Sequence, residues 1–336
     1  MDRPSAKNPP RDADSAGERQ RELQREQDRK DSAQAREGGG EQQQEKAVQA
    51  GARAQPELPF PAQHMEKPGI EARMELRPRY LAPDYRGSDK LKDMVAIITG
   101  GDSGIGRAVA VLFAREGADV AIVYLNSHED AQETKRAVEK EGQQCLLIAG
   151  DVKDSAFCRE AAEHTVKRFG KLDILVNNAA FQEHADSLED ITDERLEETF
   201  RTNIFGYFYM ARAVIPHLKQ GASIINSGSV VGLRGSAQLL DYSATKGAIH
   251  AFTMSLASSL VDKGIRVNAV APGPVWTPLN PADQPAEKVA QFGAGTDMKR
   301  PAQPEELSPA YVFLAAPACS SYITGIVLPV TGKVGD

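Results

Sequence analysis

A glycine-rich loop between a β-branched run and an apolar-periodic segment constrains this chain most. Residues 95–99 (Val-Ala-Ile-Ile-Thr) have the pattern of a short buried strand, and Gly100, Gly104 and Gly106 follow it. Apolar residues then recur at helical spacing through Ala114. Strand, glycine turn and helix predict a dinucleotide-binding unit, because glycines let the backbone approach a pyrophosphate at a helix N-terminus. The spacing is Gly-x-x-x-Gly-x-Gly, and an ordinary tight turn could use the same glycines.

A tyrosine and a lysine four residues apart, Tyr242 and Lys246, would project from one face of a helix. A phenol titrates near pH ~10 in water, and a neighbouring ammonium lowers that value toward the working range. Ser229, at a preceding strand end, could hold a carbonyl or alcohol oxygen. The arrangement suits proton exchange with that oxygen while a redox cofactor carries hydride. Taken alone, Tyr-x-x-x-Lys also occurs by chance on half-exposed helix faces.

Two further strand ends carry polar residues. Asp151 follows the apolar run 145–150 and could accept a hydrogen bond from an adenine amino group, or could cap the next helix. Asn177 and Asn178 end another run, and the small Ala179 after them leaves room for a ribose and a nicotinamide.

Strands alternate with helical patterns from Lys90 onward. We therefore expect an α/β fold, a Rossmann-type doubly wound parallel seven-stranded sheet in a single domain with an N-terminal extension. The strands are expected near residues 94–99, 119–125, 145–150, 173–178, 222–228, 266–271 and 326–330. The longest helices are expected near residues 193–219 and 241–263. Both active elements then lie at the carboxyl edge of the sheet, where such sheets bind ligands.

These motifs, in this order, resemble those of the short-chain dehydrogenase/reductase family, over roughly residues 90–331. The residues that carry the resemblance are Thr99-Gly100, Gly104-Ile105-Gly106, Asn177-Asn178-Ala179, Asn203, Ser229, Tyr242, Lys246 and Pro272-Gly273. The 100–104 loop, Leu239-Leu-Asp-Tyr242 and the arm 68–74 are similar to a bacterial subgroup whose members are often called general stress proteins or NADP-dependent aldehyde reductases.

The resemblance implies a role for each catalytic residue. Tyr242 would be the general acid/base, and Lys246 would lower its pKa and bind the nicotinamide ribose. Ser229 would orient the substrate oxygen, with Ser227 as a competitor that fits the family spacing less well. Asn203 would help to hold Lys246 and a water in a proton relay. The function implied is reversible hydride transfer between a nicotinamide and an aldehyde, ketone or sugar/polyol.

The resemblance also implies contacts to cofactor and substrate. The expected cofactor contacts are Gly100, Asp102, Ser103, Gly104, Ile105, Gly106, Tyr124, Asn126, Asp151, Val152, Asn178, Ala179, Tyr242, Lys246, Pro272, Gly273, Val275 and Thr277. The expected substrate contacts are Ser229, Tyr242 and Trp276, the last on a segment that would close over the nicotinamide. Packing in the core is the alternative for Trp276, the only tryptophan. The six histidines show no metal-ligand spacing, so no metal is expected.

The end of the second strand bears on the choice of cofactor. An acid there would bind a ribose diol and repel a 2′-phosphate, but this chain has Tyr124, Leu125 and Asn126. Asn126 and Ser127 could bind a phosphate, and Arg107 begins the first helix. We therefore expect NADP to be preferred, with NAD as the alternative.

The chain divides into three parts by composition. Residues 1–57 are rich in Gln, Glu, Arg, Lys and Ala and nearly lack large apolar side chains, so they are expected to be a disordered or transiently helical tail. Residues 58–90 are expected to form an extended arm on the domain or on a neighbouring subunit. Residues 91–336 are expected to form the catalytic domain.

Composition bears on partners and location. The N-terminus opens polar, no apolar run reaches membrane-spanning length, and three unpatterned cysteines suit a reducing compartment, so a cytoplasmic protein is expected. The net charge of −7 favours neither a nucleic-acid nor a membrane partner. The resemblance implies a homotetramer. Two other functions remain open: a catalytically silent cofactor-binding sensor or scaffold, and an epimerase or dehydratase of the extended branch.

Overall fold

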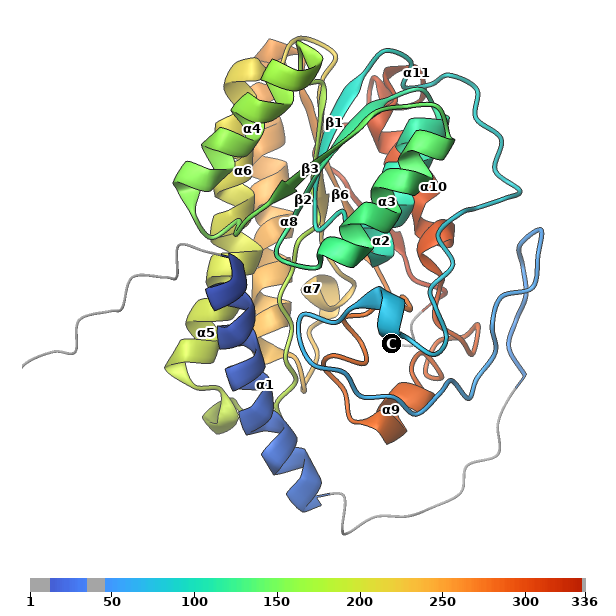
Figure 1. The fold of residues 1–336 in the computed structure, drawn as a ribbon, viewed down its shortest axis with the longest axis vertical. Coiled ribbons are helices and arrows are strands. Elements are labelled where there is room, and N and C mark those ends of the chain that lie inside the picture. Colours follow the sequence, from blue (N-terminus) through green and yellow to red (C-terminus); the bar gives the residue numbers. More distant parts are fainter. Residues whose placement is uncertain (1–12, 35–45, 334–336) are drawn as a thin grey trace, which may run out of the picture.

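The computed structural model describes residues 13–34 and 46–333, which form a parallel sheet between two layers of helices (Figure 1). In the described chain the sheet has seven strands in the order β3-β2-β1-β4-β5-β6-β7. The strands are β1 (Val95–Thr99), β2 (Asp119–Tyr124), β3 (Cys145–Ala149), β4 (Ile174–Asn177), β5 (Ser223–Ser227), β6 (Arg266–Pro272) and β7 (Val327–Val330). All pairs are parallel, which confirms the predicted fold class.

The helices cover both faces of the sheet, with α4, α6 and α8 on one side and α2, α3 and α10 on the other (Figure 1). The described helices are α1 (Ala13–Gln34), α2 (Gly104–Arg115), α3 (His128–Lys140), α4 (Ser155–Phe169), α5 (Asp193–Phe200), α6 (Gly206–Val214), α7 (Val231–Arg234), α8 (Leu240–Leu260), α9 (Ala286–Ala290), α10 (Pro304–Ala315) and α11 (Pro317–Ser320). Strand β1 is buried along its whole length, because a parallel sheet is packed on both faces.

The strand order reverses at β1, which pairs with β2 on one side and β4 on the other. The connections after β1 and β4 therefore leave the sheet in opposite directions. Such a switch point opens a crevice at the carboxyl ends of the strands, and this is where doubly wound sheets bind ligands.

The long helix expected near residues 193–219 is interrupted. A π-helical turn, Arg201–Phe205, separates α5 from α6 and carries Asn203. Asn203 is fully buried and bonds outside its own helix, and π turns of this kind often occur at functional positions.

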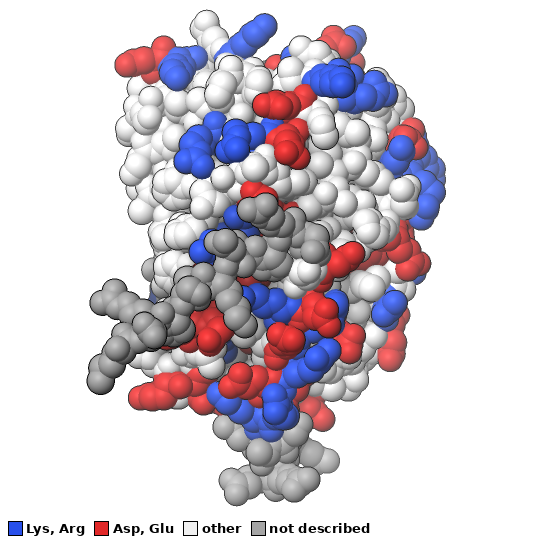
Figure 2. Space-filling view, turned by 60° about the vertical axis from the view of Figure 1, so that its left-hand side comes forward, with Lys and Arg blue, Asp and Glu red and all other residues white. Residues whose placement is uncertain are grey.

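Part of the tail that was expected to be disordered or transiently helical is a helix packed on the domain. Residues 13–34 form α1 against the domain, while residues 1–12 and 35–45 lie outside the described residues. Gln20, Gln24 and Gln27 are at least nine-tenths buried. Composition favoured disorder because the segment lacks large apolar residues, but polar side chains dock this helix. Figure 2 shows one face of the molecule, on which acidic and basic side chains are interspersed.

The arm after the tail packs against the segment that follows β6. Phe60, Met65 and Met74 of the arm form one apolar cluster with Trp276 and Val289. The arm is therefore part of the same folded unit.

Candidate active site

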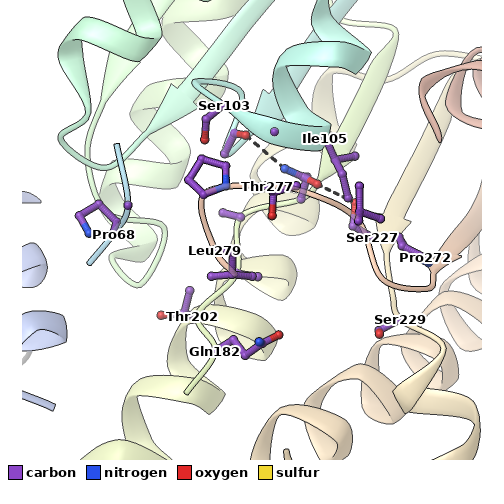
Figure 3. Close-up of a pocket in the computed structure, with 18 of the residues that line it drawn as sticks. Pro68, Ser103, Ile105, Gln182, Thr202, Ser227, Ser229, Pro272, Thr277 and Leu279 are labelled. Atoms are coloured by element: carbon purple, nitrogen blue, oxygen red, sulfur yellow. Dashed lines mark hydrogen bonds between the residues drawn. The ribbon is translucent and has the colours of Figure 1, made fainter. Parts of the chain in front are cut away.

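A cleft of about 350 Å³ opens at the carboxyl ends of β1, β2, β4, β5 and β6. Figure 3 shows Ser103, Thr277, Ser229 and Gln182 around this space. Most of the residues predicted to bind cofactor or substrate line it. They are Gly100, Asp102, Ser103, Gly104, Ile105, Tyr124, Asp151, Val152, Asn178, Ala179, Ser229, Tyr242, Lys246, Pro272, Gly273, Val275 and Thr277. Gly106, Asn126, Asn203 and Trp276 do not line it.

The glycine-rich loop has the geometry that only glycine allows. Gly100 and Gly104 have φ values of 62° and 50°, in the left-handed region. A Cβ on Gly106 would lie 2.0 Å from the main-chain oxygen of Gly100. Gly106 therefore acts by letting the first turn of α2 approach the loop, and the loop leaves a cradle that fits a pyrophosphate.

The ends of β1, β4 and β5 are joined by side chains on the floor of the cleft. Thr99 Oγ1 accepts hydrogen bonds from the main-chain nitrogens of Asn178 (2.9 Å) and Ala179 (3.1 Å). Asn178 Nδ2 donates to the Gly100 oxygen at 3.2 Å, and Ser227 Oγ donates to Asn178 Oδ1 at 3.1 Å (Figure 3, dashed lines). These contacts fix the spacing of the strand ends.

Asp151 offers an unused acceptor to the cleft. Its Oδ1 accepts from the main-chain nitrogen of Lys153 at 2.9 Å, whereas its Oδ2 is buried, accepts no hydrogen bond among the described residues and lies 3.5 Å from Nζ of Lys153. Burial raises the pKa of this carboxyl group, an effect that Lys153 opposes. A buried carboxylate oxygen that accepts no hydrogen bond here fits an amino-group donor such as that of adenine.

The end of β2 carries no acidic side chain. Tyr124, Leu125 and Ser127 line the cleft, and the Tyr124 hydroxyl lies 3.0 Å from Nδ1 of His128. Asn126 lies just outside the lining, where its Nδ2 donates to Asp14 of α1 at 3.4 Å.

Arg107 is not available to a phosphate, contrary to the interpretation that placed it near one. Its guanidinium is 1% exposed and forms ion pairs with Glu71 of the arm and with Asp130. Glu71 also accepts a hydrogen bond from the main-chain nitrogen of Gly104 at 2.7 Å, so a side chain of the arm holds the glycine loop in place. Burial raises the pKa of Glu71 to about 7, and Arg107 opposes that shift.

Tyr242 and Lys246 on α8 and Ser229 after β5 face the same cleft. Lys246 Nζ donates to the main-chain oxygen of Ser227 at 2.8 Å and lies 5.3 Å from the centre of the Tyr242 ring. Burial lowers the pKa of Lys246 to about 7. Burial raises the pKa of Tyr242 well above its usual value, with smaller contributions from Asp283 and Tyr311, while Ser229 acts in the opposite direction.

Asn203 lies behind the cleft. Its Oδ1 accepts from the main-chain nitrogen of Phe181 at 2.8 Å, and its Nδ2 donates to the oxygen of Phe181 at 2.9 Å and to Thr245 Oγ1 at 3.1 Å. Asn203 therefore joins the π-helical turn to α8 one residue before Lys246, with no direct bond to Lys246.

Trp276 does not line the cleft and packs in the core, which is the alternative that the sequence left open. The side chain is 1% exposed, lies 4.6 Å from the Phe60 ring between centroids, and donates from Nε1 to the Leu76 oxygen at 2.8 Å. Burial of the large apolar ring in this cluster, with its one N–H group hydrogen-bonded, stabilises the fold.

Three lining residues from the N-terminal region were missed by the sequence analysis: Gln20 of α1, and Pro68 and Gly69 of the arm. The turn-forming Pro-Gly pair was a local signal for a chain reversal, but nothing local in the sequence placed it beside the cleft.

A buried ionic cluster lies below the substrate end and was also missed. His184 is held between Asp283 (Nδ1 to Oδ1, 3.0 Å) and Asp31 of α1 (Nε2 to Oδ2, 3.0 Å), and Lys67 pairs with Glu183 at 3.1 Å. These hydrogen bonds raise the pKa of His184 to about 10 despite its burial. Glu183, His184 and Asp283 have the spacing of metal ligands, but both ring nitrogens of His184 already face carboxylates.

Comparisons with known proteins agree with this geometry. A family model described as "Enoyl-(Acyl carrier protein) reductase" matches residues 100–332. "General stress protein 39" of Bacillus subtilis is 57% identical over 82% of this chain and 96% of its own length. "NADPH-dependent aldehyde reductase 1, chloroplastic" of Arabidopsis thaliana is 50% identical over 80% of this chain and 96% of its own length.

A short-chain dehydrogenase from Burkholderia cenocepacia, solved in complex with NADP, superposes with a TM-score of 0.68 and 32% identity, over 73% of this chain and 99% of that one. The fold and the cleft thus define a nicotinamide-dependent oxidoreductase acting on CH–OH groups or their carbonyl counterparts. The chain belongs to the short-chain dehydrogenase/reductase family. In the described part of the chain, every helix is too short or too polar to cross a membrane.

Proposed function

We propose that this protein is an NADP-preferring carbonyl reductase that acts reversibly on aldehydes, with Tyr242 as the general acid/base. The observation that carries the proposal is that Tyr242, Lys246 and Ser229 line one cleft with the glycine loop. The cofactor, when bound, exchanges a hydride with the carbonyl carbon of the substrate. All remaining chemistry concerns one proton and the substrate oxygen.

The buried phenol of Tyr242 is suited to be the proton donor in the reductive direction. Because burial raises the pKa of Tyr242, the hydroxyl is protonated at neutral pH and can donate to an oxygen that gains negative charge. The Ser229 hydroxyl is positioned to donate to the same oxygen, so two donors would stabilise the developing charge. In the oxidative direction the phenolate form of Tyr242 would accept the alcohol proton and return to the hydroxyl.

The walls of the substrate end favour a small carbonyl compound. Val231, Leu239 and Leu279 supply apolar surface, and Gln182 and Asn280 supply polar groups. Aldehydes are the first class to test, since a relative half identical to this chain carries that activity in its name. Ketones and sugars or polyols are the next.

The preference for NADP is supported at the end of β2, where no acid faces the cleft to bind a free ribose diol. Two of the known proteins compared carry NADP or NADPH in their names. A higher kcat/KM with NADH than with NADPH would contradict the preference.

The deciding experiment follows NADPH and NADH oxidation at 340 nm with a panel of aldehydes, ketones and sugars, for wild type and Tyr242→Phe. Turnover that the substitution abolishes supports the proposal. Tight cofactor binding without turnover in either direction would favour the catalytically silent sensor instead.

We further propose a homotetramer. Large apolar side chains are exposed on the outer surfaces of α6 and α8 and beside β7, among them Phe208 (49%), Met254 (49%) and Tyr322 (102%). Exposed apolar patches of this kind mark subunit contacts. Light scattering on the purified chain measures the mass of the assembly and so tests the homotetramer.

The free cysteines, two of them buried, support a cytoplasmic location.

A further inference from the structure

Helix α1 is fixed to the domain by a polar side chain that reaches two other segments. Gln24 is 2% exposed, and its Nε2 donates to the main-chain oxygens of Met65 (2.7 Å) and Ala282 (3.1 Å). Its Oε1 accepts from the main-chain nitrogen of Lys67 at 2.8 Å. The helix is therefore joined both to the arm and to the segment after β6.

The first turns of α1 lie beside the adenosine end of the cleft. Gln20 lines the cleft, and its Nε2 donates to Glu198 at 3.1 Å. A Cβ on Gly17 would lie 2.7 Å from Nδ2 of Asn126, the residue after β2 and Leu125. Glycine lets the helix backbone approach the position at which this family of sheets distinguishes a ribose diol from a 2′-phosphate.

One cation of α1, Arg21, lies near this position, just outside the residues that line the cleft. Nη1 of Arg21 is 3.6 Å from the same point on Gly17 and donates to the Lys67 oxygen at 3.4 Å. Arg21 is half-buried, and within residues 13–34 and 46–333 no carboxylate lies in ion-pair range of it. Arg107, by contrast, is surrounded by the carboxylates of Glu71 and Asp130.

We infer that α1 forms a wall of the adenosine-ribose subsite and that Arg21 binds the 2′-phosphate of NADP. The inference rests on the NADP preference proposed above. Arg21 would supply the positive charge for the 2′-phosphate that the residues at the end of β2 do not supply. A guanidinium offers a planar pair of donors that matches a phosphate group. The exposed carboxylate of Asp14 contacts Asn126 and would repel a phosphate there, so Asp14→Asn should strengthen 2′-phosphate binding slightly.

The test uses ligands that differ only in the group concerned. Isothermal titration of the full chain would compare adenosine 2′,5′-bisphosphate with adenosine 5′-monophosphate, which requires no turnover. We expect Arg21→Ala to weaken the bisphosphate roughly tenfold, the size of one charge-assisted contact, and to leave the monophosphate within about twofold. Arg21→Lys should recover part of the loss. Arg25→Ala, at an exposed position on α1, is the matched control.

Each other result overturns the inference in a distinct way. An equal loss for both ligands would mean that Arg21 only supports the fold, which the urea midpoint of each variant would show independently. If wild type prefers the bisphosphate and Arg21→Ala keeps that preference, the inference fails while the NADP preference stands. If wild type binds both ligands equally, the NADP preference itself fails.

Discussion

Lys246 lies with its Nζ 5.3 Å from the centre of the Tyr242 ring and 2.8 Å from the main-chain oxygen of Ser227. The two side chains are one helical turn apart on α8, so their separation is set by the helix and not by a flexible loop. Burial acts on them in opposite senses, raising the pKa of the phenol and lowering that of the amine to about 7. Both groups are thereby biased toward their uncharged forms.

Tyr242→Phe should lower kcat by a factor of about 10²–10⁴, the usual contribution of a positioned general acid. The ring remains and fills the same space, so the Kd for NADPH should change little. Stopped-flow or steady-state absorbance at 340 nm measures kcat, and cofactor fluorescence measures Kd. Tyr85→Phe, at a tyrosine that does not line the cleft, is the control. If kcat stayed within about threefold of wild type, another group would be the proton donor.

Lys246→Met should change how stability depends on pH. In the native state the pKa of Lys246 is about 7, below its usual 10.5, so the folded chain binds fewer protons than the unfolded chain between these values. The stability of wild type relative to the variant should therefore rise as the pH increases from 7 toward 10.5.

Urea unfolding of the ligand-free protein at pH 6, 7, 8 and 9 measures this difference. Lys263→Met, at an exposed position near the end of α8, is the control variant. A curve for Lys246→Met that runs parallel to that of wild type would show that the amine of Lys246 is charged in the folded state throughout this range.

His184→Asn should give a dependence of the opposite sign. Hydrogen bonds to Asp283 and Asp31 raise the native pKa of His184 from 6.5 to about 10, so its stabilising effect is complete below pH 6.5 and is lost as the pH rises toward 10. The gap in unfolding free energy between wild type and variant should narrow over that interval. A gap that widens with pH would mean that the imidazole is neutral in the cluster.

The fold and the floor of the cleft were predictable because their signals are local. Each of these patterns predicts the backbone conformation of the residues that form it: the buried β-branched run, the glycine loop and the small residues after Asn178. Helix α1 could not be predicted in this way. Gln20 and Gln24 hold it on the domain through hydrogen bonds to Glu198 and Ala282, which are distant in the sequence. The composition of a segment does not predict such contacts. The sequence left the position of Trp276 open for the same reason, since its partners lie in the arm.

Trp276→Phe should destabilise the protein by about 1–3 kcal/mol, because it leaves the Leu76 oxygen without its donor and opens space beside Phe60. KM for the substrate should stay near the wild-type value, since the ring does not line the cleft. Urea unfolding measures the first effect and steady-state kinetics the second. A large rise in KM with unchanged stability would show that Trp276 contacts the substrate.

Arg107→Met should cost about 3–5 kcal/mol of stability, because it leaves the buried carboxylates of Glu71 and Asp130 without their cation. Pairing it with Glu71→Gln should recover part of that loss, since the double variant removes one of the unpaired charges. The ratio of the Kd values for NADPH and NADH should stay within about twofold of wild type, because this guanidinium is already enclosed by carboxylates. A selective loss of NADPH affinity would instead assign the 2′-phosphate to Arg107, and the role inferred for Arg21 would then be wrong.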